Sequence, residues 1–217
     1  METHDKIAGV VFDWDGVLLD SLGASYNVYN KIFERVGTKR LSMDEFLTLQ
    51  SPNWYEFYIK VGVPKERWNE VDAEWVRLYR EEAPRLHSDA LTCLSELNGA
   101  GFKLAIVTNG SKARVEGELA KFGLAQYFGS VLCGEKREEL KPSPIMIERT
   151  LRVLGVGPRE AVYVGDAPAD IQASKSAGVP SIALAREPIL VERLKLENPD
   201  QVFGGLDDVA AFVLGRR

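Results

Sequence analysis

Short apolar runs alternate with helical patterns along most of this chain, and this alternation limits its fold more than any other feature. From Ser88 onward the pattern predicts four buried strands, at 104–107, 130–133, 161–164 and 181–184. Helices separate these strands, and Gly or Pro marks nearly every junction. Strands that alternate with helices of this length are parallel neighbours, with helices on both faces of the sheet. The expected fold class is α/β, with a doubly wound, mainly parallel sheet.

The segment before Ser88 has a different pattern. Residues 7–12 form an apolar run that predicts the first strand, whereas residues 21–82 are helical, without a convincing strand. Ser42 and Glu45 have the spacing of a capping box at a helix start. The prediction is a small α-helical cap domain at 21–87, inserted after the first strand of a Rossmann-like core formed by 1–20 and 88–217.

Aromatic residues recur at helical spacing inside the predicted cap. The two stripes consist of Tyr26, Tyr29, Phe33 and Val36, and of Trp68, Val71, Trp75, Leu78 and Tyr79. Core packing is the more common use of such stripes, so we interpret them mostly as the core of a helical module. The segment after Pro52 offers candidate ligand contacts, for which a structural role is at least as plausible: Asn53, Trp54, Tyr55 and Tyr58.

The composition excludes several classes of partner. With 45% hydrophobic residues, the chain can bury one sizeable core and a small inserted module. A formal net charge of −5 argues against nucleic acid and against an anionic membrane surface as partners. The sequence shows neither an apolar run of membrane-spanning length nor a secretion signal at its start, so a cytoplasmic location is expected. Cys93 and Cys133 lack a metal-binding spacing and are expected to be reduced thiols.

Two aspartates directly follow the first predicted strand. Asp13 and Asp15 are two residues apart on an extended chain, so both carboxylates leave the strand end on the same side. Gly16 then allows the backbone to turn sharply. Two carboxylates this close repel each other by about 4 kcal/mol at an effective dielectric constant of about 20, so they need a cation, a shared proton or hydrogen-bond donors. The pair therefore indicates a metal site or acid–base chemistry.

Polar residues suited to phosphate follow the second strong strand. Thr108 and Asn109 come at the end of the 104–107 strand, where a hydroxyl, backbone N–H groups and a helix N-terminus suit phosphate oxygens. The same residues also form ordinary turns. Lys141 precedes Pro142 in a rigid loop before a helix, although a lone lysine is most often a solvated surface charge.

Two more aspartates follow the 161–164 strand. Asp166 and Asp170 are four residues apart, and on the first turn of a helix they are expected to face the same way, as oxygen ligands of Mg²⁺ do. Helix capping is the alternative explanation, because an aspartate at a helix N-terminus is favourable without any metal. This alternative is more serious for Asp170 than for Asp166.

Taken in order, these elements resemble the haloacid dehalogenase superfamily of phosphohydrolases. The matching motifs are Asp13-Trp14-Asp15-Gly16-Val17-Leu18, Thr108-Asn109, Lys141-Pro142, and Gly165-Asp166 with Asp170. The resemblance extends from Ile7 to about Leu184, and the helical insert is similar to the cap of the subgroup that includes phosphoglycolate phosphatases and β-phosphoglucomutases. Trp14 and Val17 replace the more common Phe and Thr, and neither change alters a group that the mechanism requires.

The resemblance implies a Mg²⁺-dependent phosphatase that acts on a small phosphorylated metabolite through an aspartyl-phosphate. In this scheme Asp13 is the nucleophile, and Asp15 is the general acid and then the general base. The metal ligands are the Asp13 carboxylate, the backbone carbonyl of Asp15, and Asp166, with Asp170 as a direct ligand or as support.

The resemblance also implies the phosphate-binding residues. Thr108 and Asn109 would bind phosphoryl oxygens through the hydroxyl and the N–H groups that follow it. Lys141 would offset the charge of both the phosphoryl group and Asp13.

Three alternatives remain beside this scheme. A β-phosphoglucomutase-like phosphosugar mutase would carry an Arg-Gly-containing segment in its cap, which is not found between Ser21 and Leu86. A non-catalytic phosphate-binding protein on the same fold would not need an acidic nucleophile beside its anion. A flavodoxin-type nucleotide-binding domain would have a Gly-, Ser- or Thr-rich loop after its first strand, where this chain is acidic. Members of the resembled superfamily that use other chemistry replace the second aspartate, so the resemblance with Asp15 in place implies phosphate esters as substrates. The oligomeric state, monomer or homodimer, stays open.

Overall fold

The computed structural model describes residues 6–51 and 54–217, so Asn53, one of the candidate cap contacts, lies outside the described residues. Its strands are β1 Gly9–Phe12, β2 Leu19–Asp20, β3 Arg85–Leu86, β4 Lys103–Thr108, β5 Phe128–Cys133, β6 Ala161–Gly165, β7 Ser181–Leu184 and β8 Gln201–Phe203. Its helices are α1 Leu22–Val36, α2 Met43–Leu49, α3 Trp54–Val61, α4 Trp68–Glu82, α5 Ala90–Gly99, α6 Lys112–Phe122, α7 Ile145–Leu154, α8 Pro168–Ser176, α9 Pro188–Lys195 and α10 Leu206–Leu214.

The chain divides into two compact units. The larger unit contains Leu86–Arg217 together with the chain up to Leu18, and the smaller unit is Leu19–Arg85. The polypeptide therefore leaves the larger unit after β1 and returns to it after α4.

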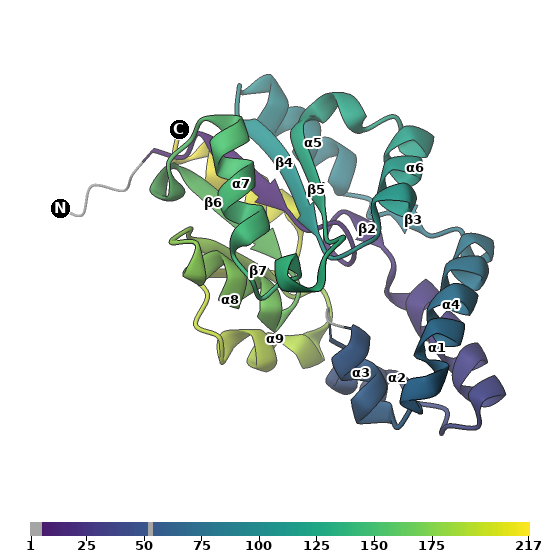
Figure 1. Cartoon of the computed structure of the whole chain (residues 1–217). Helices are drawn as coiled ribbons and strands as arrows, with labels where there is room; N and C mark the ends of the chain where they lie inside the picture. The colour runs from purple at the N-terminus through teal and green to yellow at the C-terminus, as the bar shows by residue number, and fades with distance from the viewer. Residues whose placement is uncertain (1–5, 52–53) are drawn as a thin grey trace. The chain divides into compact units, whose positions relative to one another are not determined.

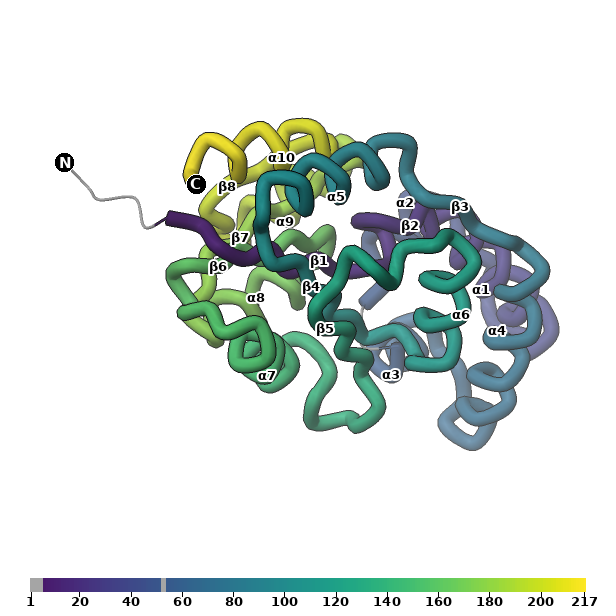
Figure 2. Tube along the Cα trace, turned by 90° about the horizontal axis from the view of Figure 1, so that it is seen from above, coloured from purple at the N-terminus to yellow at the C-terminus, as the bar shows by residue number. Residues whose placement is uncertain are grey.

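The larger unit is built on a six-stranded sheet with the order β5-β4-β1-β6-β7-β8, in which every paired strand is parallel. Strand β1 lies in the middle of its neighbours, with Phe12 paired to Ile106 of β4 and to Val164 of β6. Helices α7 and α8 cover one face of this sheet, and α5 and α10 cover the other (Figure 1 and Figure 2). The predicted α/β class with a mainly parallel sheet is confirmed.

Apolar side chains on both faces of the strands hold these layers together. Val11 and Ala105 pack on the face covered by α7, in one cluster with Met146 and Leu151. Side chains alternate along a strand, so Val10 and Phe12 project to the opposite face, and both are fully buried. Strands buried on both faces have continuous apolar sequences, and for this reason the sequence predicts these strands.

The smaller unit is helical, with its own core. The predicted stripes are confirmed as packing residues: Phe33, Val71, Leu78 and Tyr79 are buried, and the remaining stripe residues of α1 and α4 pack against them. The predicted capping box at α2 is also present, since Ser42 Oγ accepts from Glu45 N–H and Glu45 accepts from Ser42 N–H. In the part of the chain that the structure describes, none of the helices has the length and apolarity needed to cross a membrane.

Two candidate ligand contacts of this unit have packing roles. Tyr58 is buried in the helical core, and its hydroxyl donates a hydrogen bond of 2.7 Å to Asp72. The ring of Tyr55 lies 5.2 Å from that of Trp68. Both contacts are internal to the unit, which favours the structural interpretation of these two side chains.

Two local features differ from the prediction. Asp166 does not lie on a helix, because α8 begins at Pro168 and its N-cap residue is Ala167. The stretch from Pro188 to Phe203 contains a helix and an edge strand, α9 and β8, which the pattern did not predict.

Candidate active site

Three neighbouring strands carry the predicted site residues at one edge of the sheet. Asp13 directly follows β1, Thr108 is the last residue of β4, and Asp166 directly follows β6. Because β4 and β6 both pair with β1 in parallel, these three carboxyl ends meet at the same edge. Ligands of open α/β sheets bind at this edge, so the strand order assembles a candidate site from distant segments.

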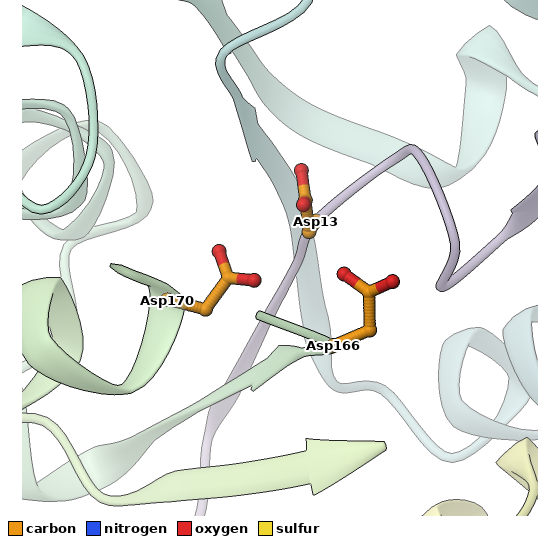
Figure 3. Close-up of side chains that lie close together, drawn as sticks. All are labelled: Asp13, Asp166 and Asp170. Carbon is orange, nitrogen blue, oxygen red and sulfur yellow. The ribbon is translucent and has the colours of Figure 1, made fainter. Parts of the chain in front are cut away.

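Three carboxylates converge at this edge. Asp13, Asp166 and Asp170 each offer an oxygen, and these oxygens all lie within 4.8 Å of one another (Figure 3). Burial raises the pKa of Asp13 to about 7, although the Lys141 ammonium opposes this effect. Burial, followed by the charges of Asp170 and Asp13, raises the pKa of Asp166 well above its ordinary value. The group therefore holds more negative charge than its surroundings stabilise.

Lys141 is a buried cation that contacts this cluster directly. Its side chain is 1% exposed, and Nζ lies 2.9 Å from Asp13 Oδ1 and 2.6 Å from Asp170 Oδ1. Burial alone lowers the pKa of Lys141, but the carboxylates of Asp13 and Asp170 outweigh it and raise the pKa above its usual range. The alternative of a solvated surface lysine does not apply, since Lys141 is a buried charge that bridges two carboxylates.

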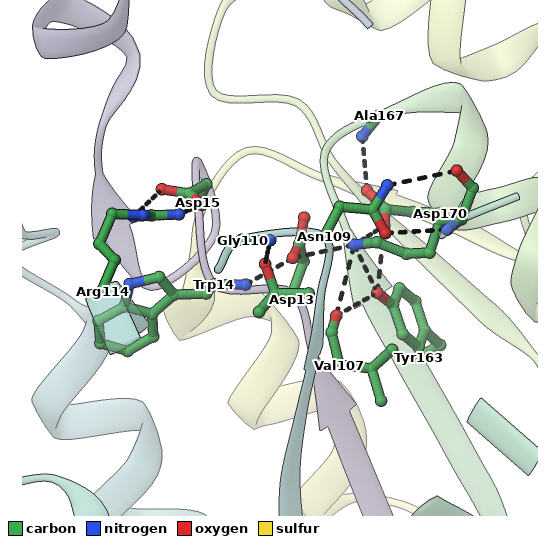
Figure 4. A network of polar contacts seen from close by, with 12 residues as sticks. Asp13, Trp14, Asp15, Val107, Asn109, Gly110, Arg114, Tyr163, Ala167 and Asp170 are labelled. Atoms are coloured by element: carbon green, nitrogen blue, oxygen red, sulfur yellow. Dashed lines mark hydrogen bonds and ion pairs between the residues drawn. The ribbon is translucent and has the colours of Figure 1, made fainter. Parts of the chain in front are cut away.

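Asp170 combines two functions. Its Oδ2 accepts from Ala167 N–H at 3.0 Å, which closes the N-terminus of α8, while Oδ1 contacts Lys141 and accepts from the Tyr163 hydroxyl at 3.1 Å (Figure 4). Asp170 therefore caps α8, as the alternative explanation proposed, and also belongs to the acidic group. Because both oxygens already have partners, Asp170 is better suited to support the cluster than to be its main ligand.

The second motif holds the loop of Lys141 in place. Asn109 Oδ1 accepts from Lys141 N–H at 2.8 Å, and Asn109 Nδ2 donates to Lys141 O at 3.3 Å. Thr108 Oγ1 accepts from Gly110 N–H at 3.1 Å, and a hydroxyl that accepts a hydrogen bond still has its own hydrogen to donate. The side chains of Asn109 and Thr108 thus both have partners within the site, and the phosphate-binding roles of these two residues stay predictions.

Two glycines allow these groups to approach so closely. Gly16 has φ of +76°, and a Cβ at this position would lie 1.9 Å from Asp166 Oδ2. A Cβ on Gly165 would lie 2.3 Å from the Cβ of Asp170. Any side chain at either position would displace a carboxylate of the acidic group, so both glycines are part of the site.

Tyr163 is a site residue that the sequence pattern did not reveal. Its hydroxyl lies within hydrogen-bond distance of three groups beneath the cluster: Val107 O at 2.9 Å, Lys141 Nζ at 3.1 Å and Asp170 Oδ1 at 3.1 Å. In the sequence, Tyr163 is one more large residue in an apolar strand. A tyrosine in a fully buried strand needs a partner for its hydroxyl, and this is the signal that could have identified it.

The carboxylate of Asp15 is directed to Arg114 of α6 (Figure 4). Arg114 Nη1 donates to Asp15 Oδ1 at 3.0 Å, and Nη2 donates to Oδ2. Arg114 also contacts Glu118, one helical turn later. Neither α6 residue was predicted, because an Arg and a Glu four residues apart on a helix are usually an exposed surface pair.

The donor set of the cluster fits a hard divalent cation. Three carboxylates face one lysine, and carboxylate oxygens are the ligands that such cations prefer. The raised pKa values of Asp13 and Asp166 reflect the same excess of negative charge, which a bound cation would relieve.

Comparison with known proteins identifies a protein family that matches most of this chain. The family model for haloacid dehalogenase-like hydrolases matches residues 10–184. A phosphoglycolate phosphatase of Shigella dysenteriae is 28% identical over 235 residues, covering 96% of this chain and 93% of that protein. A phosphoglycolate phosphatase of Neisseria meningitidis is 27% identical, with 94% and 93% covered. The crystal structure of a predicted phosphoglycolate phosphatase from Haemophilus somnus has a TM-score of 0.81 at 23% identity, covering 98% of this chain and 99% of that one.

Proposed function

Because this chain belongs to the haloacid dehalogenase-like hydrolase family, we propose that it is a Mg²⁺-dependent phosphatase of a small phosphorylated metabolite that works through an aspartyl-phosphate on Asp13. The expected enzyme class, a phosphoric monoester hydrolase, is confirmed by the family match together with the phosphatase relatives. One observation carries the finer proposal: Lys141 bridges Asp13 and Asp170 beside Asp166.

The proposed metal ligands are Asp13, Asp166 and the backbone carbonyl of Asp15. Asp170 would support them, since it already holds Lys141 and caps α8. Bound Mg²⁺ would neutralise the carboxylates and polarise the phosphoryl group, so that a dianion can approach an acidic site.

Asp13 is the residue that we propose forms the covalent intermediate. Its Oδ1 accepts from Trp14 N–H at 2.7 Å and contacts Lys141, so the carboxylate is held in one orientation. In the first step an oxygen of Asp13 attacks phosphorus, the bond between phosphorus and the ester oxygen breaks, and the leaving alkoxide takes a proton from Asp15. Lys141, the Thr108 hydroxyl and the N–H of Asn109 would bind the phosphoryl oxygens in this step.

The second step returns the enzyme to its starting state. Asp15, now a carboxylate, takes a proton from water while the water oxygen attacks phosphorus. The bond between phosphorus and the Asp13 oxygen breaks, which releases inorganic phosphate and restores the Asp13 carboxylate. The overall reaction is hydrolysis of a phosphomonoester, with the Asp15 proton lost in the first step and regained in the second.

The substrate of the proposed phosphatase can be sought with a panel of phosphorylated metabolites. The two curated relatives are named for phosphoglycolate, so we place 2-phosphoglycolate in a first panel together with other small phosphorylated acids, sugars and nucleotides. The panel is assayed for release of inorganic phosphate, with Mg²⁺ and with a chelator. We expect release from at least one member with Mg²⁺ and none with the chelator. Isomerised sugar phosphate without free phosphate, or release that the chelator leaves unchanged, would contradict the proposal.

Mg²⁺ binding is expected to strengthen as the pH rises. Asp13, with a pKa near 7 in the metal-free protein, carries a proton below that pH, and the ion must displace it. The affinity should therefore rise up to about tenfold per pH unit between about pH 6 and pH 7 for each proton displaced. Calorimetric titration in two buffers of different ionisation enthalpy would measure both the affinity and the protons released.

The stability of the metal-free protein should fall as the pH rises, in contrast to the Mg²⁺ affinity. A folded-state pKa of about 7, above the ordinary 3.8, means that unfolding releases a proton between these values, so the stability falls as the pH rises through about 7. Mg²⁺ should then raise the melting temperature more at about pH 8 than at about pH 6. An affinity for Mg²⁺ that is constant across this range would show that Asp13 is not a ligand.

A further inference from the structure

We propose that Arg114 is a positioning residue for Asp15, and that Glu118 and Trp14 hold Arg114 in the required place. The inference rests on the proposed function, because it assigns a task to Arg114 in the protonation of the leaving group. It also makes a claim about the direction of the Asp15 side chain, which can be tested without any activity.

The contact between Arg114 and Asp15 is made at two points. Nη1 donates to Oδ1 at 3.0 Å, and Nη2 donates to Oδ2, so the planar guanidinium faces both carboxylate oxygens. A two-point contact of this kind fixes the rotation of a carboxylate as well as its position. The Arg114 side chain is 13% exposed and that of Asp15 is 33% exposed, so the pair is partly buried. A lysine at the same place would supply the charge without the fixed direction.

Glu118 holds Arg114 from the next turn of α6. Its Oε2 lies 3.1 Å from Arg114 Nη1, and its side chain is 15% exposed. The same Oε2 accepts from the indole Nε1 of Trp14 at 2.7 Å. Trp14 and Asp15 are adjacent in the chain, so the contacts from Trp14 through Glu118 and Arg114 to Asp15 form a closed ring. Trp14, which replaces the more common Phe, therefore supplies a donor that phenylalanine lacks.

Gly110 closes the remaining side of the pair. A Cβ on this residue would lie 2.4 Å from Arg114 Nη2 and 3.3 Å from Asp15 Oδ2. The ion pair thus packs against the backbone of the loop that follows β4, which also carries Thr108 and Asn109. The direction of Asp15 is consequently fixed relative to the residues proposed to bind phosphate.

A simple tether between α6 and the first loop is the competing explanation. A tether would be equally well served by Glu118 and Trp14 alone, which already join these two segments. Arg114 adds a contact to the one carboxylate of the loop whose direction matters for proton transfer. If Arg114 is only a tether, its removal should lower kcat/KM equally for all esters. If it positions Asp15, the loss should be larger for esters whose leaving group needs a proton.

The kinetic experiment compares kcat/KM for two esters in the presence of Mg²⁺. β-Glycerol phosphate releases a basic alkoxide that needs a proton, whereas 4-nitrophenyl phosphate releases a phenolate that leaves without one. With Arg114→Ala we expect a loss of about 100-fold on β-glycerol phosphate and of less than about fivefold on 4-nitrophenyl phosphate. Trp14→Phe should lower the ratio of kcat/KM for β-glycerol phosphate to that for 4-nitrophenyl phosphate by a smaller factor. The ratio for Arg114→Lys should lie between those of wild type and Arg114→Ala.

Arg152→Ala is the matched control, since Arg152 is an exposed arginine of α7 whose Nε donates to the backbone oxygen of Glu148. It should leave both esters unchanged. Equal losses on the two esters with Arg114→Ala would overturn the positioning role. A wild-type protein that hydrolyses neither these esters nor any member of the panel would instead overturn the proposed function, and the direction of Asp15 would still be decided by crystallography. Crystal structures of wild type and Arg114→Ala should show the Asp15 carboxylate turned away from Gly110 only in the variant, and an unchanged direction would refute the proposal.

Discussion

Replacing Asp13 with asparagine is expected to abolish phosphate release and to prevent formation of a phosphorylated enzyme. The amide has nearly the shape of the carboxylate, but it lacks both the charge that attacks phosphorus and a strong metal ligand. Removal of a covalent nucleophile from a site whose residues act together typically costs on the order of 10⁴-fold or more in kcat. Phosphate release and trapping of the acyl-phosphate by mass spectrometry at low pH would measure the two effects.

Asp208→Asn is a suitable control for this variant. Asp208 is exposed on the first turn of α10, so its replacement removes one negative charge from the larger unit without touching the acidic group. It should retain the activity of the wild type. An Asp13→Asn protein that releases phosphate at the wild-type rate would remove Asp13 from the mechanism.

Lys141→Met is expected to damage stability as well as activity. Lys141 is buried between Asp13 and Asp170, and methionine would fill much of its volume without its charge. Breaking a buried ion pair by removing one partner usually costs about 3–5 kcal/mol, because the remaining charge is left uncompensated. The free energy of unfolding from urea titration should fall by about this amount above pH 7. Mg²⁺ should recover part of the loss, because a bound cation would compensate the same carboxylates.

The comparison for this variant is Lys195→Met on α9. Lys195 forms an exposed pair with Glu192 at 2.9 Å, and exposed pairs contribute about 0–1 kcal/mol. Lys141→Met should also lower kcat by about 10²–10³-fold, as expected when a group that stabilises transition-state charge is removed. If the stabilities of Lys141→Met and Lys195→Met matched, the bridging role of Lys141 would be refuted.

The layered fold could be predicted because its central strands are buried on both faces. Continuous apolar runs at β1, β4, β6 and β7 fell within a few residues of the observed strands. The region of α9 and β8 was not predicted, since β8 is an edge strand of three partly buried residues and has no comparable apolar run. Edge elements depend on tertiary contacts that local patterns do not contain.

The site could be predicted where its residues come directly after strands. Asp13, Thr108 and Asp166 were found because parallel strands bring their carboxyl ends to one edge, and this rule needs no side-chain detail. Asp166 was placed on the wrong element, because Pro168 starts α8 two residues after it. The metal-binding and catalytic roles of these residues stay predictions.

The supporting residues could not be found in this way. Tyr163 lies inside a strand, and Arg114 and Glu118 lie on a helix, where nothing in the local spacing indicates their partners. Their contacts join segments about 50–100 residues apart, so only the assembled fold brings them together. Trp14 was recognised as unusual, but its bond to Glu118 depends on where α6 packs.

The insertion of the helical unit between two paired strands has a consequence for how such a chain can change. Phe12 of β1 pairs with Ile106 of β4, although the whole of Leu19–Arg85 lies between them in the chain. Closing a loop costs entropy that grows only with the logarithm of its length, so doubling the inserted segment would cost the core only about 0.6 kcal/mol. An insert of another length or shape could therefore be exchanged through β2 and β3 while the strand ends that carry Asp13, Thr108 and Asp166 keep their register.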